Sequence, residues 1–299
     1  MSAPIRTERL TKTFRRVGAL NGLDLEVPEG SIYALVGPNG AGKTTAIKIL
    51  MNIFQPTSGR AEVLGTASRR VHGKVFRSIG YVSENQKLPD WMRVDAFLRY
   101  MRPFYPTWDR DLENDLVTRL ELPRDRKVKQ LSRGMKMKVA LASALAFRPK
   151  LIVLDEPLGG LDPLVRDELI EGLLDRAAEA TIFISSHDLA EIESFASHVG
   201  YLEQGRLVFS EQMGSLTARF REVELTFDTS PELVGTYPDN WMHVNASAAV
   251  VRFIESQFEE AKTSSEIARV FGAARNTEFR PMSLRSIFLA MAKARRSIS

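Results

Sequence analysis

The sequence predicts an α/β fold whose core is a mostly parallel sheet. Three short segments, 32–36, 151–154 and 181–185, have the length and the apolar, β-branched composition of buried strands. Each ends in glycine or polar residues, and helical patterns separate them along the chain. Such alternation favours parallel strands joined by crossover helices, and ligands of these sheets bind where the strands end.

The segment after the first of these strands is rich in glycine and fits the pattern G-x-x-x-x-G-K-[ST]. It consists of Gly37, Pro38, Asn39, Gly40, Ala41, Gly42, Lys43, Thr44 and Thr45. The glycines allow several backbone N–H groups to point at one phosphate chain, and the start of the following helix adds more donors. Lys43 supplies a charge for the β- and γ-phosphates, and the Thr44 hydroxyl can ligate Mg²⁺. The flanking strand and helix favour a nucleotide site over a turn without a ligand.

The composition is that of a globular protein with a full core. Of the 299 residues, 44% are hydrophobic and none is cysteine, which excludes disulfides and thiolate chemistry. The 41 basic and 37 acidic residues are interspersed, so a mixed solvated surface is favoured over a nucleic-acid or anionic-membrane surface. We find no signal peptide and no apolar run of the ~20 residues that span a bilayer. We therefore expect a cytoplasmic or membrane-peripheral protein.

The N-terminal residues predict short strands at 5–10 and 23–27, with a turn-rich stretch between them. Phe14 lies in that stretch. An isolated aromatic residue usually belongs to a core. This one is also placed where its ring could stack on a base bound by the glycine-rich loop.

Strands are also predicted at 61–65 and 79–83. The polar residues Glu84, Asn85 and Gln86 follow the second of them directly. Because ligands of open α/β sheets bind at the carboxyl ends of the strands, these residues mark a plausible edge of the site.

Residues 92–148 predict a mostly helical insertion. Apolar residues recur there at three- and four-residue spacing, and three prolines interrupt the pattern. The last helix of the insertion runs to about residue 147, and Ser132 is a good N-cap for it. For Ser132 and Gly134 alone, a simple cap and turn is the commoner interpretation.

Two acids at the end of the strand 151–154 give the second strong signal. Paired carboxylates at the end of a buried strand are costly without a cation or hydrogen-bond partners. Beside a phosphate-binding loop, they indicate that Asp155 holds Mg²⁺ and that Glu156 orients and polarises the attacking water. Solvated acids in a loop are the alternative.

The turn at 159–163 suits the start of a helix at about 164–178, since Asp162 can cap it and a proline follows. The strand 181–185 comes next and leads to His187. A lone histidine is more often structural than catalytic, but this position lies near that expected for the γ-phosphate. Residues 198–209 then predict a hairpin.

The pattern of predicted elements changes near residue 220. Strands are predicted at 223–227 and 249–253, and helices at 255–271 and 282–296, so we expect a small separate α+β unit. Its C-terminal helix is basic and carries Ile287, Phe288 and Met291 on one face. Docking of that face on its own domain is favoured over contact with a membrane or a partner.

Five motifs stand in one order, and together they resemble the ATP-binding subunit of a bacterial ABC transporter. They are the Walker A loop at 37–45, the signature Leu131-Ser132-Arg133-Gly134-Met135, the Walker B strand at 151–156, the D-loop at 160–162 and the switch histidine His187. The resemblance covers about residues 4–215. It implies a P-loop NTPase core with an antiparallel β subdomain and a helical subdomain at about 85–148. We expect an ATP-binding domain at 1–220 and an accessory domain at 221–299.

The resemblance implies a role for each matching residue. Glu156 would be the catalytic base, with Lys43 on the phosphates and His187 sensing the γ-phosphate. Thr44, Glu84 and Asp155 would be the ligands of Mg²⁺. The residues implied to bind ATP are Phe14, Gly37, Pro38, Asn39, Gly40, Ala41, Gly42, Lys43, Thr44, Thr45, Ser132, Gly134 and Asp162.

In this family two ATP-binding subunits close head to tail. Ser132 and Gly134 would therefore meet the γ-phosphate of ATP held by the partner chain, with Asp162 bridging the interface. The partner could be a second copy or a different chain.

The sequence departs from the family pattern at two motifs. Arg133 and Met135 replace the first glycine and the glutamine of the signature, whereas Ser132 and Gly134 are kept. Glu84 stands where the family has a magnesium-sensing glutamine, and a carboxylate can also ligate Mg²⁺. Both variants, and the small C-terminal domain, are similar to those of bacterial exporter ATPases.

We therefore expect an ATPase on the inner face of the cell membrane that drives a separate permease. Export of a drug, peptide or lipid-like substrate is implied. Contacts with the permease are expected near the helical subdomain, with Trp91, Met92, Phe97 and Tyr100 as candidates, although core packing is at least as common for such residues. An ABC ATPase of ribosomes or DNA, or a non-hydrolysing regulatory subunit, is the alternative. No nucleic-acid partner is expected.

Overall fold

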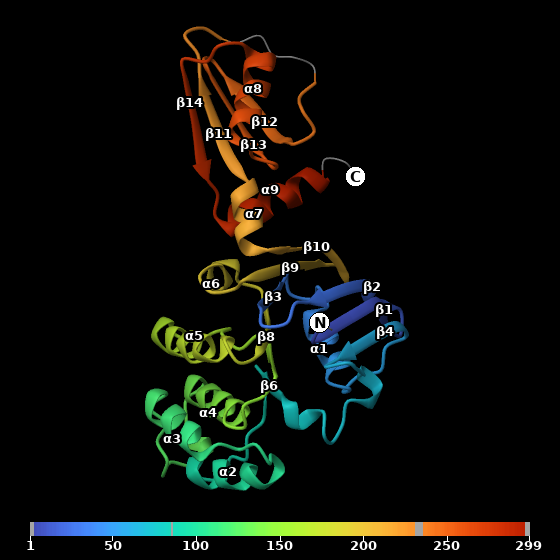
Figure 1. The fold of residues 1–299 in the computed structure, drawn as a ribbon, viewed down its shortest axis with the longest axis vertical. Coiled ribbons are helices and arrows are strands. Elements are labelled where there is room, and N and C mark those ends of the chain that lie inside the picture. Colours follow the sequence, from blue (N-terminus) through green and yellow to red (C-terminus); the bar gives the residue numbers. More distant parts are fainter. Residues whose placement is uncertain (1–2, 85, 231–235, 297–299) are drawn as a thin grey trace. The chain divides into compact units, whose positions relative to one another are not determined.

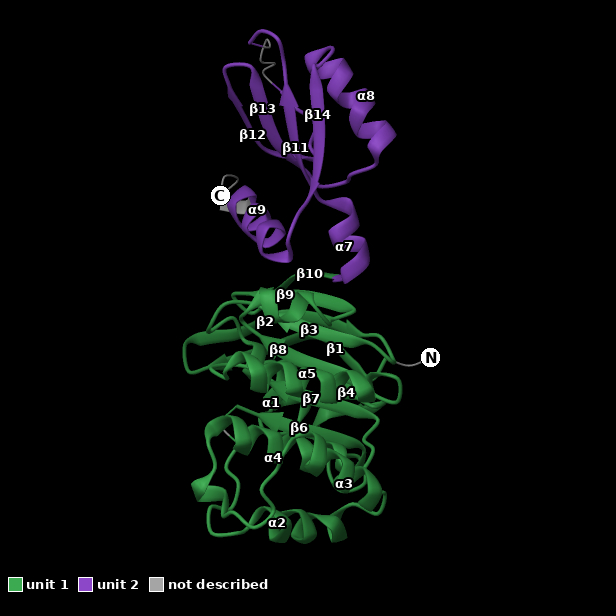
Figure 2. Cartoon of the chain, turned by 90° about the vertical axis from the view of Figure 1, so that its left-hand side faces the viewer, with its two compact units in different colours: residues 1–210 green, residues 211–299 purple. Residues whose placement is uncertain are grey.

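The computed structural model describes residues 3–84, 86–230 and 236–296. The chain forms two compact units, residues 1–210 and 211–299 (Figure 2). We describe each unit by itself.

The centre of the first unit is a six-stranded sheet with the spatial order β10-β9-β3-β8-β7-β6. Its strands are β3 (Ile32–Val36), β6 (Ile79–Ser83), β7 (Leu151–Asp155), β8 (Thr181–Ser186), β9 (His198–Glu203) and β10 (Arg206–Gln212). The pairs β9/β3, β3/β8, β8/β7 and β7/β6 are parallel, as the alternation of strands and helices predicted. The carboxyl ends of β3, β6, β7 and β8 therefore lie along one edge.

A second, antiparallel sheet has the order β2-β1-β4-β5. Its strands are β1 (Ile5–Phe14), β2 (Val17–Val27), β4 (Ser58–Val63) and β5 (Thr66–Ala67). The first two extend well beyond the predicted 5–10 and 23–27, because their antiparallel pairing continues past several register irregularities to Phe14 and Val17. Phe14 thus ends a strand and does not lie in a turn-rich stretch.

Helix α1 (Lys43–Leu50) packs between the two sheets. Ile47 and Leu50 of this helix share one buried cluster with Leu23 of the antiparallel sheet and with Leu35 and Val153 of the parallel sheet. Figure 1 shows α1 and the antiparallel sheet on one side of the parallel sheet, with α4 and α5 on the other. The helix that begins at the glycine-rich loop is therefore fixed on both sides.

The predicted helical insertion follows β6. Its helices are α2 (Val94–Met101), α3 (Arg110–Arg119) and α4 (Arg133–Leu145), and the later helices of the unit are α5 (Pro163–Ala177) and α6 (Leu189–Glu193). Short 3₁₀ helices occur at η1 (Ser68–Arg70), η2 (Phe76–Ser78), η3 (Arg102–Phe104) and η4 (Val128–Gln130). Phe97, a candidate permease contact, is buried in α2 and belongs to the core, whereas Trp91 and Tyr100 are 71% and 54% exposed.

The second unit is a four-stranded antiparallel sheet with the order β12-β13-β11-β14. Its elements are α7 (Met213–Arg219), β11 (Arg221–Thr226), β12 (Trp241–Ser247), β13 (Val250–Glu255), α8 (Glu260–Phe271), β14 (Asn276–Pro281) and α9 (Leu284–Arg296). Ile267 of α8 packs with Trp241 and Phe253 of the sheet. The predicted helix at 255–271 is too long at its start, because residue 255 still belongs to a strand.

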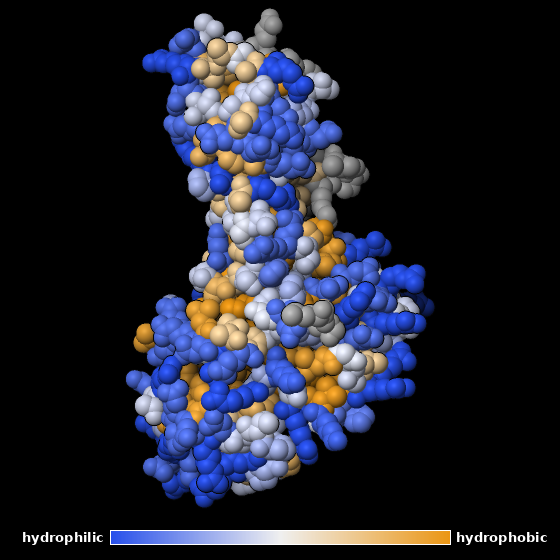
Figure 3. All heavy atoms as spheres, viewed as in Figure 1, coloured by the Kyte–Doolittle hydropathy of each residue, from blue (hydrophilic) through white to orange (hydrophobic). Residues whose placement is uncertain are grey.

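The C-terminal helix α9 packs against β12 of its own unit, and part of its predicted apolar face is buried. Leu284, Ile287 and Phe288 are at most 5% exposed. The His243 ring donates a hydrogen bond from Nε2 to the Ala290 carbonyl at 2.8 Å. Among the described residues, no helix has the length and apolar composition to cross a bilayer, and hydrophilic side chains cover most of the face seen in Figure 3.

Candidate functional site

The glycine-rich loop joins β3 to α1 and lines a cavity of about 230 Å³. Gly40 and Gly42 have φ angles of 81° and 110°, which side chains other than glycine rarely adopt. A Cβ atom at Gly37 would come within 2.1 Å of the Leu202 carbonyl oxygen. The cavity is lined by Ala19, Asn39, Gly40, Ala41, Gly42, Lys43, Thr44, Thr45, Glu84 and Glu156. Close backbone packing thus requires glycine in this loop, and the helix start it creates offers N–H groups to an anion.

Lys43 is 5% exposed and is tied to the loop and to Glu156. Its Nζ atom donates to the Gly37 carbonyl at 2.6 Å and lies 3.1 Å from Oε1 of Glu156. The other carboxylate oxygen of Glu156 lies 2.8 Å from Nδ1 of His187. The structure therefore brings the three predicted catalytic residues into one hydrogen-bonded chain at the ends of β3, β7 and β8.

Asp155 and Thr44 form the predicted metal-binding pair. The Thr44 hydroxyl donates to Oδ1 of Asp155 at 2.9 Å, and Asp155 is 4% exposed. Burial raises the pKa of Asp155 above its usual value, and the hydrogen bonds from Ser185 and Thr44 oppose that rise. No group of three or more His, Cys, Asp or Glu residues that could hold a metal occurs in the described ranges.

The Ser185 hydroxyl contacts both acids, which the sequence did not predict. It donates to Oδ1 of Asp155 at 2.9 Å and accepts from the backbone N–H of Glu156 at 3.0 Å. The register of β7 and β8 places Ser185 opposite Asp155. Glu156 has a φ angle of 52°, a strained value for this residue type. The Ser185 bond therefore helps to fix an unusual backbone turn between the two acids.

The signature and D-loop residues begin helices at some distance in sequence from the loop. Ser132 caps α4 by accepting from the Met135 N–H at 3.2 Å, and Asp162 caps α5 by accepting from the Val165 N–H at 3.1 Å. Both side chains are exposed, whereas Gly134 is buried against Val165. These residues are not among those that line the loop cavity. Ser132, Gly134 and Asp162 therefore do not form part of the wall of the cavity that contains Lys43.

Glu84, the third predicted metal ligand, lines the loop cavity and is ion-paired with Arg133 at 2.5 Å. Its backbone N–H donates to the Asp155 carbonyl at 2.9 Å, which fixes the end of β6 beside the end of β7. Asn85 lies outside the described residues. Phe14 is 40% exposed and packs edge-on against Phe54 with ring centroids 5.4 Å apart, outside the cavity lining.

Comparison with known proteins identifies the family. A model of the ABC transporter family matches residues 20–159. The chain is 31% identical to the ABC transporter ATP-binding protein YtrB of Bacillus subtilis over 231 residues. This alignment covers 77% of this chain and 79% of YtrB. The chain belongs to the ABC transporter family. It is an ATP-binding subunit, and it hydrolyses ATP for transport.

Two further ABC proteins are similar to this chain. The bacitracin transport ATP-binding protein BcrA of Enterococcus faecalis is 33% identical over 77% of this chain and 76% of its own length. The ATP-binding cassette MJ0796, in a dimeric structure with ADP and Pi, matches with a TM-score of 0.63 and 23% identity over 70% of this chain and 98% of that chain. The latter likeness shows the ABC ATPase fold.

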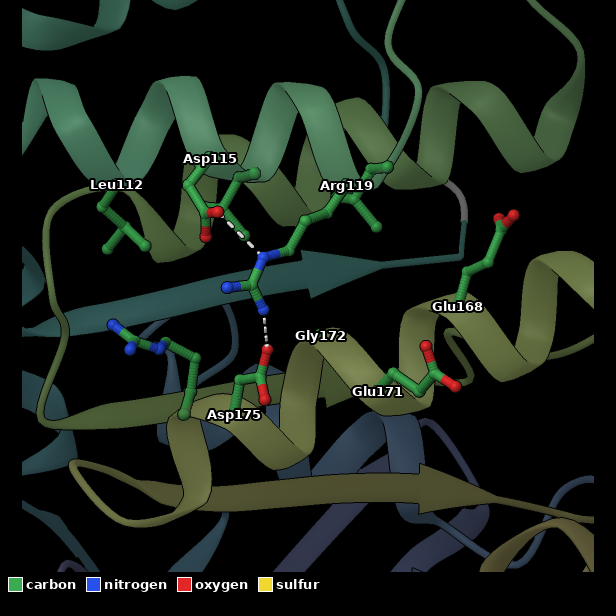
Figure 4. Close-up of a pocket in the computed structure, with 10 residues that line it drawn as sticks. Leu112, Asp115, Arg119, Glu168, Glu171, Gly172 and Asp175 are labelled. Atoms are coloured by element: carbon green, nitrogen blue, oxygen red, sulfur yellow. Dashed lines mark hydrogen bonds and ion pairs between the residues drawn. The ribbon is translucent and has the colours of Figure 1, made fainter.

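A larger cavity of about 490 Å³ in this ABC ATPase lies between α3 and α5 (Figure 4). Arg119 crosses it and forms ion pairs with Asp115 of its own helix and Asp175 of α5. The cavity shares none of its lining residues with the glycine-rich loop cavity. The smaller cavity has the backbone donors and the lysine that phosphates require.

Proposed function

We propose that this subunit closes on ATP as a head-to-tail dimer and drives a separate membrane permease that exports a drug, peptide or lipid-like substrate. The observation that carries the proposal is that Lys43 and Glu156 line one cavity, whereas Ser132 is exposed and absent from its lining. The similarity to a bacitracin transport protein supports the class of substrate.

We propose that Thr44 and Asp155 hold Mg²⁺ together with phosphate oxygens of ATP. A hydroxyl and a single carboxylate suit Mg²⁺, which is commonly bound by one or two carboxylates, phosphates and water. When bound, Mg²⁺ would offset the negative charge that develops on the phosphate oxygens. Glu84 is the remaining candidate ligand, and its ion pair with Arg133 competes with that role.

In the proposed reaction, Glu156 orients the attacking water and takes its proton. The carboxylate lies at the end of β7 and is 13% exposed, so few other waters compete for it. His187 lies against one of its oxygens and would report the presence of the γ-phosphate. Lys43 and the N–H groups of the Gly37–Thr45 loop would bind the phosphates, with Phe14 stacking on the base.

The second half of each site would come from the partner subunit. Ser132 and the backbone at Gly134 begin α4, where the positive end of the helix favours an anion. We propose that they contact the γ-phosphate held by the other subunit, with Asp162 at the interface. The permease would dock near the exposed aromatic residues Trp91 and Tyr100, on the cytoplasmic side of the membrane.

The dimer is tested with the variant Glu156→Gln, which should bind ATP without hydrolysing it. We expect a monomer in ADP and a dimer in ATP with Mg²⁺ by size-exclusion chromatography with light scattering. A Lys43→Ala change in the same chain should abolish the shift. A chain that binds ATP and remains monomeric at high protein concentration would contradict the head-to-tail model.

A further inference from the structure

Glu84 and Arg133 are two positions at which this chain departs from the family pattern, and the structure pairs them. Their side chains come from the end of β6 and the first turn of α4, 49 residues apart in sequence. Oε1 of Glu84 lies 2.5 Å from Nη2 of Arg133. The family pattern has a glutamine and a glycine at these positions, so it contains no such ion pair.

The pair lies at the edge of the ATP site. Glu84 lines the loop cavity together with Lys43 and Glu156. A Cβ atom placed on Gly159 would lie 4.0 Å from Oε1 of Glu84 and 3.9 Å from Cε1 of His187. The Glu84 carboxylate therefore stands close to the acids and the histidine at which ATP is hydrolysed.

Arg133 lies on the other side of the same loop. A Cβ atom placed on Gly160 would come within 3.0 Å of its Nη1 atom, so the guanidinium lies directly over that glycine. Gly160 has a φ angle of 67°, and both features favour glycine at this position. The guanidinium is thus held between the D-loop and Glu84.

The pair is poorly suited to stabilising the fold. The side chains are 39% and 51% exposed, and exposed ion pairs contribute little to stability because solvent screens them. Their charge matters more for the site. Glu156 and Glu84 both bring carboxylates to a cavity that must accept a triphosphate, and Lys43 is the positive side chain among the residues that line it.

We propose that Arg133 neutralises Glu84, so that an acidic residue is tolerated beside the phosphates of ATP. The inference rests on the proposed nucleotide site but not on dimer closure, because both side chains belong to the same chain. Glu84 is then the partner of Arg133, and Thr44 and Asp155 hold the metal ion. The pair also connects the edge of a subunit's own ATP site with the signature that it offers to its partner.

The test is a titration of the monomeric protein with the fluorescent nucleotide mant-ADP in EDTA at low salt. Arg133→Gln keeps the length of the side chain and removes its charge. We expect it to weaken mant-ADP binding about fivefold, since an unpaired negative charge then faces the phosphates across several ångströms. The loss should shrink at high salt.

A double variant separates charge compensation from a merely structural role. Glu84→Gln together with Arg133→Gln should restore mant-ADP affinity to the wild-type value, because both charges are then absent. Arg99→Gln is the matched control, since Arg99 also pairs with an acid, Asp95, on the exposed face of α2. It should leave the affinity unchanged.

Three results would overturn the proposal. One is an Arg133→Gln variant that has the unfolding temperature of the wild type and also its affinity for mant-ADP. Another is a double variant that binds as weakly as Arg133→Gln. The third is a Glu84→Gln variant that binds mant-ADP normally in EDTA but needs more Mg²⁺ to bind mant-ATP, which would make Glu84 a metal ligand. If the wild-type protein itself did not bind mant-ADP, that result would instead contradict the proposed nucleotide site.

Discussion

The carboxyl edge of the parallel sheet and the starts of α4 and α5 hold their functional residues in different ways. At the sheet edge, Lys43 and Asp155 are at most 5% exposed. Lys43 is paired with Glu156 after β7, and Asp155 accepts a hydrogen bond from Ser185 of β8. At the helix starts, Ser132 and Asp162 are exposed, and each caps the helix that it begins. The first region is therefore organised within one chain, whereas the second leaves its capping side chains open to solvent. This difference is what we expect of two half-sites.

The largest effect on turnover is expected from Glu156→Gln at the sheet edge. Loss of a general base lowers kcat by about a thousandfold, within the usual range for such groups. Because the amide keeps the size of the side chain, mant-ATP affinity should stay within about twofold of the wild type. Steady-state ATPase assays and the titration check both values. Normal turnover, or an equal loss of binding, would contradict the assignment, and Glu171→Gln on α5 serves as control.

Ser132→Asp tests the helix start. Aspartate caps a helix as well as serine does, so α4 should keep its stability, but its charge would repel a phosphate. We expect ATPase activity to fall about a hundredfold, comparable with removal of one donor from a transition-state site. Monomer affinity for mant-ATP should not change. Ser283→Asp is the matched control, because Ser283 likewise accepts a hydrogen bond from a backbone N–H, that of Ser286, at the start of α9.

If Ser132→Asp weakened nucleotide binding by the monomer as much as it lowered turnover, Ser132 would belong to the site of its own chain. The two regions would then not be separate half-sites.

Ser185→Ala should have a smaller effect on turnover. The change removes the hydroxyl that joins the Asp155 carboxylate to the Glu156 N–H, and we expect kcat to fall about tenfold as the acids lose their orientation. Unfolding free energy should fall by about 1–3 kcal/mol, because the partly buried N–H of Glu156 loses its partner. Ser143→Ala, which removes a buried hydroxyl from α4, should reduce stability without lowering kcat. Equal effects of the two changes on kcat would argue against an orienting role.

The smallest effect on turnover is expected from Glu113→Gln in the helical subdomain. Burial alone would raise the pKa of Glu113, but hydrogen bonds from Arg102 and Trp108 lower it below its usual value. The substitution should reduce unfolding free energy at pH 7 by about 2 kcal/mol, because Arg102 loses its buried ionic partner. ATPase activity of the folded variant should stay normal.

The pH dependence of this loss has a defined sign. Because the pKa of Glu113 is lower in the folded chain than in the unfolded one, its stabilisation is complete above the unfolded pKa of about 4.3 and is lost as the pH falls through the folded value. The difference between wild type and variant should therefore disappear in acid. Urea unfolding at pH 7 and below pH 4 measures it, and an equal difference at both would contradict the ionic role.

Local patterns in the sequence predicted much of this arrangement. The strand 79–83, the strand ending at Asp155 and the cap at Ser132 follow from runs of a few residues whose chemistry determines their conformation. The same holds for the glycine-rich loop. These elements place most of the expected site residues at one edge of the sheet.

Other features depend on contacts between distant segments and could not be predicted from local patterns. The Ser185 contact needs the register of β7 and β8, and the Glu84–Arg133 pair needs the packing of α4 beside β6. Strand β14 is polar and largely exposed, so its sequence lacks the alternation that reveals a strand.

The most direct test of two half-sites is activity after mixing Lys43→Ala protein with Ser132→Asp protein. Each variant alone should be nearly inactive, since every site in its dimers contains one defect. Random pairing in equal amounts should restore about a quarter of wild-type ATPase activity, because half of the dimers then carry one intact site out of two. A mixture no more active than its separate components would contradict the proposal that each ATP site combines half-sites from two subunits.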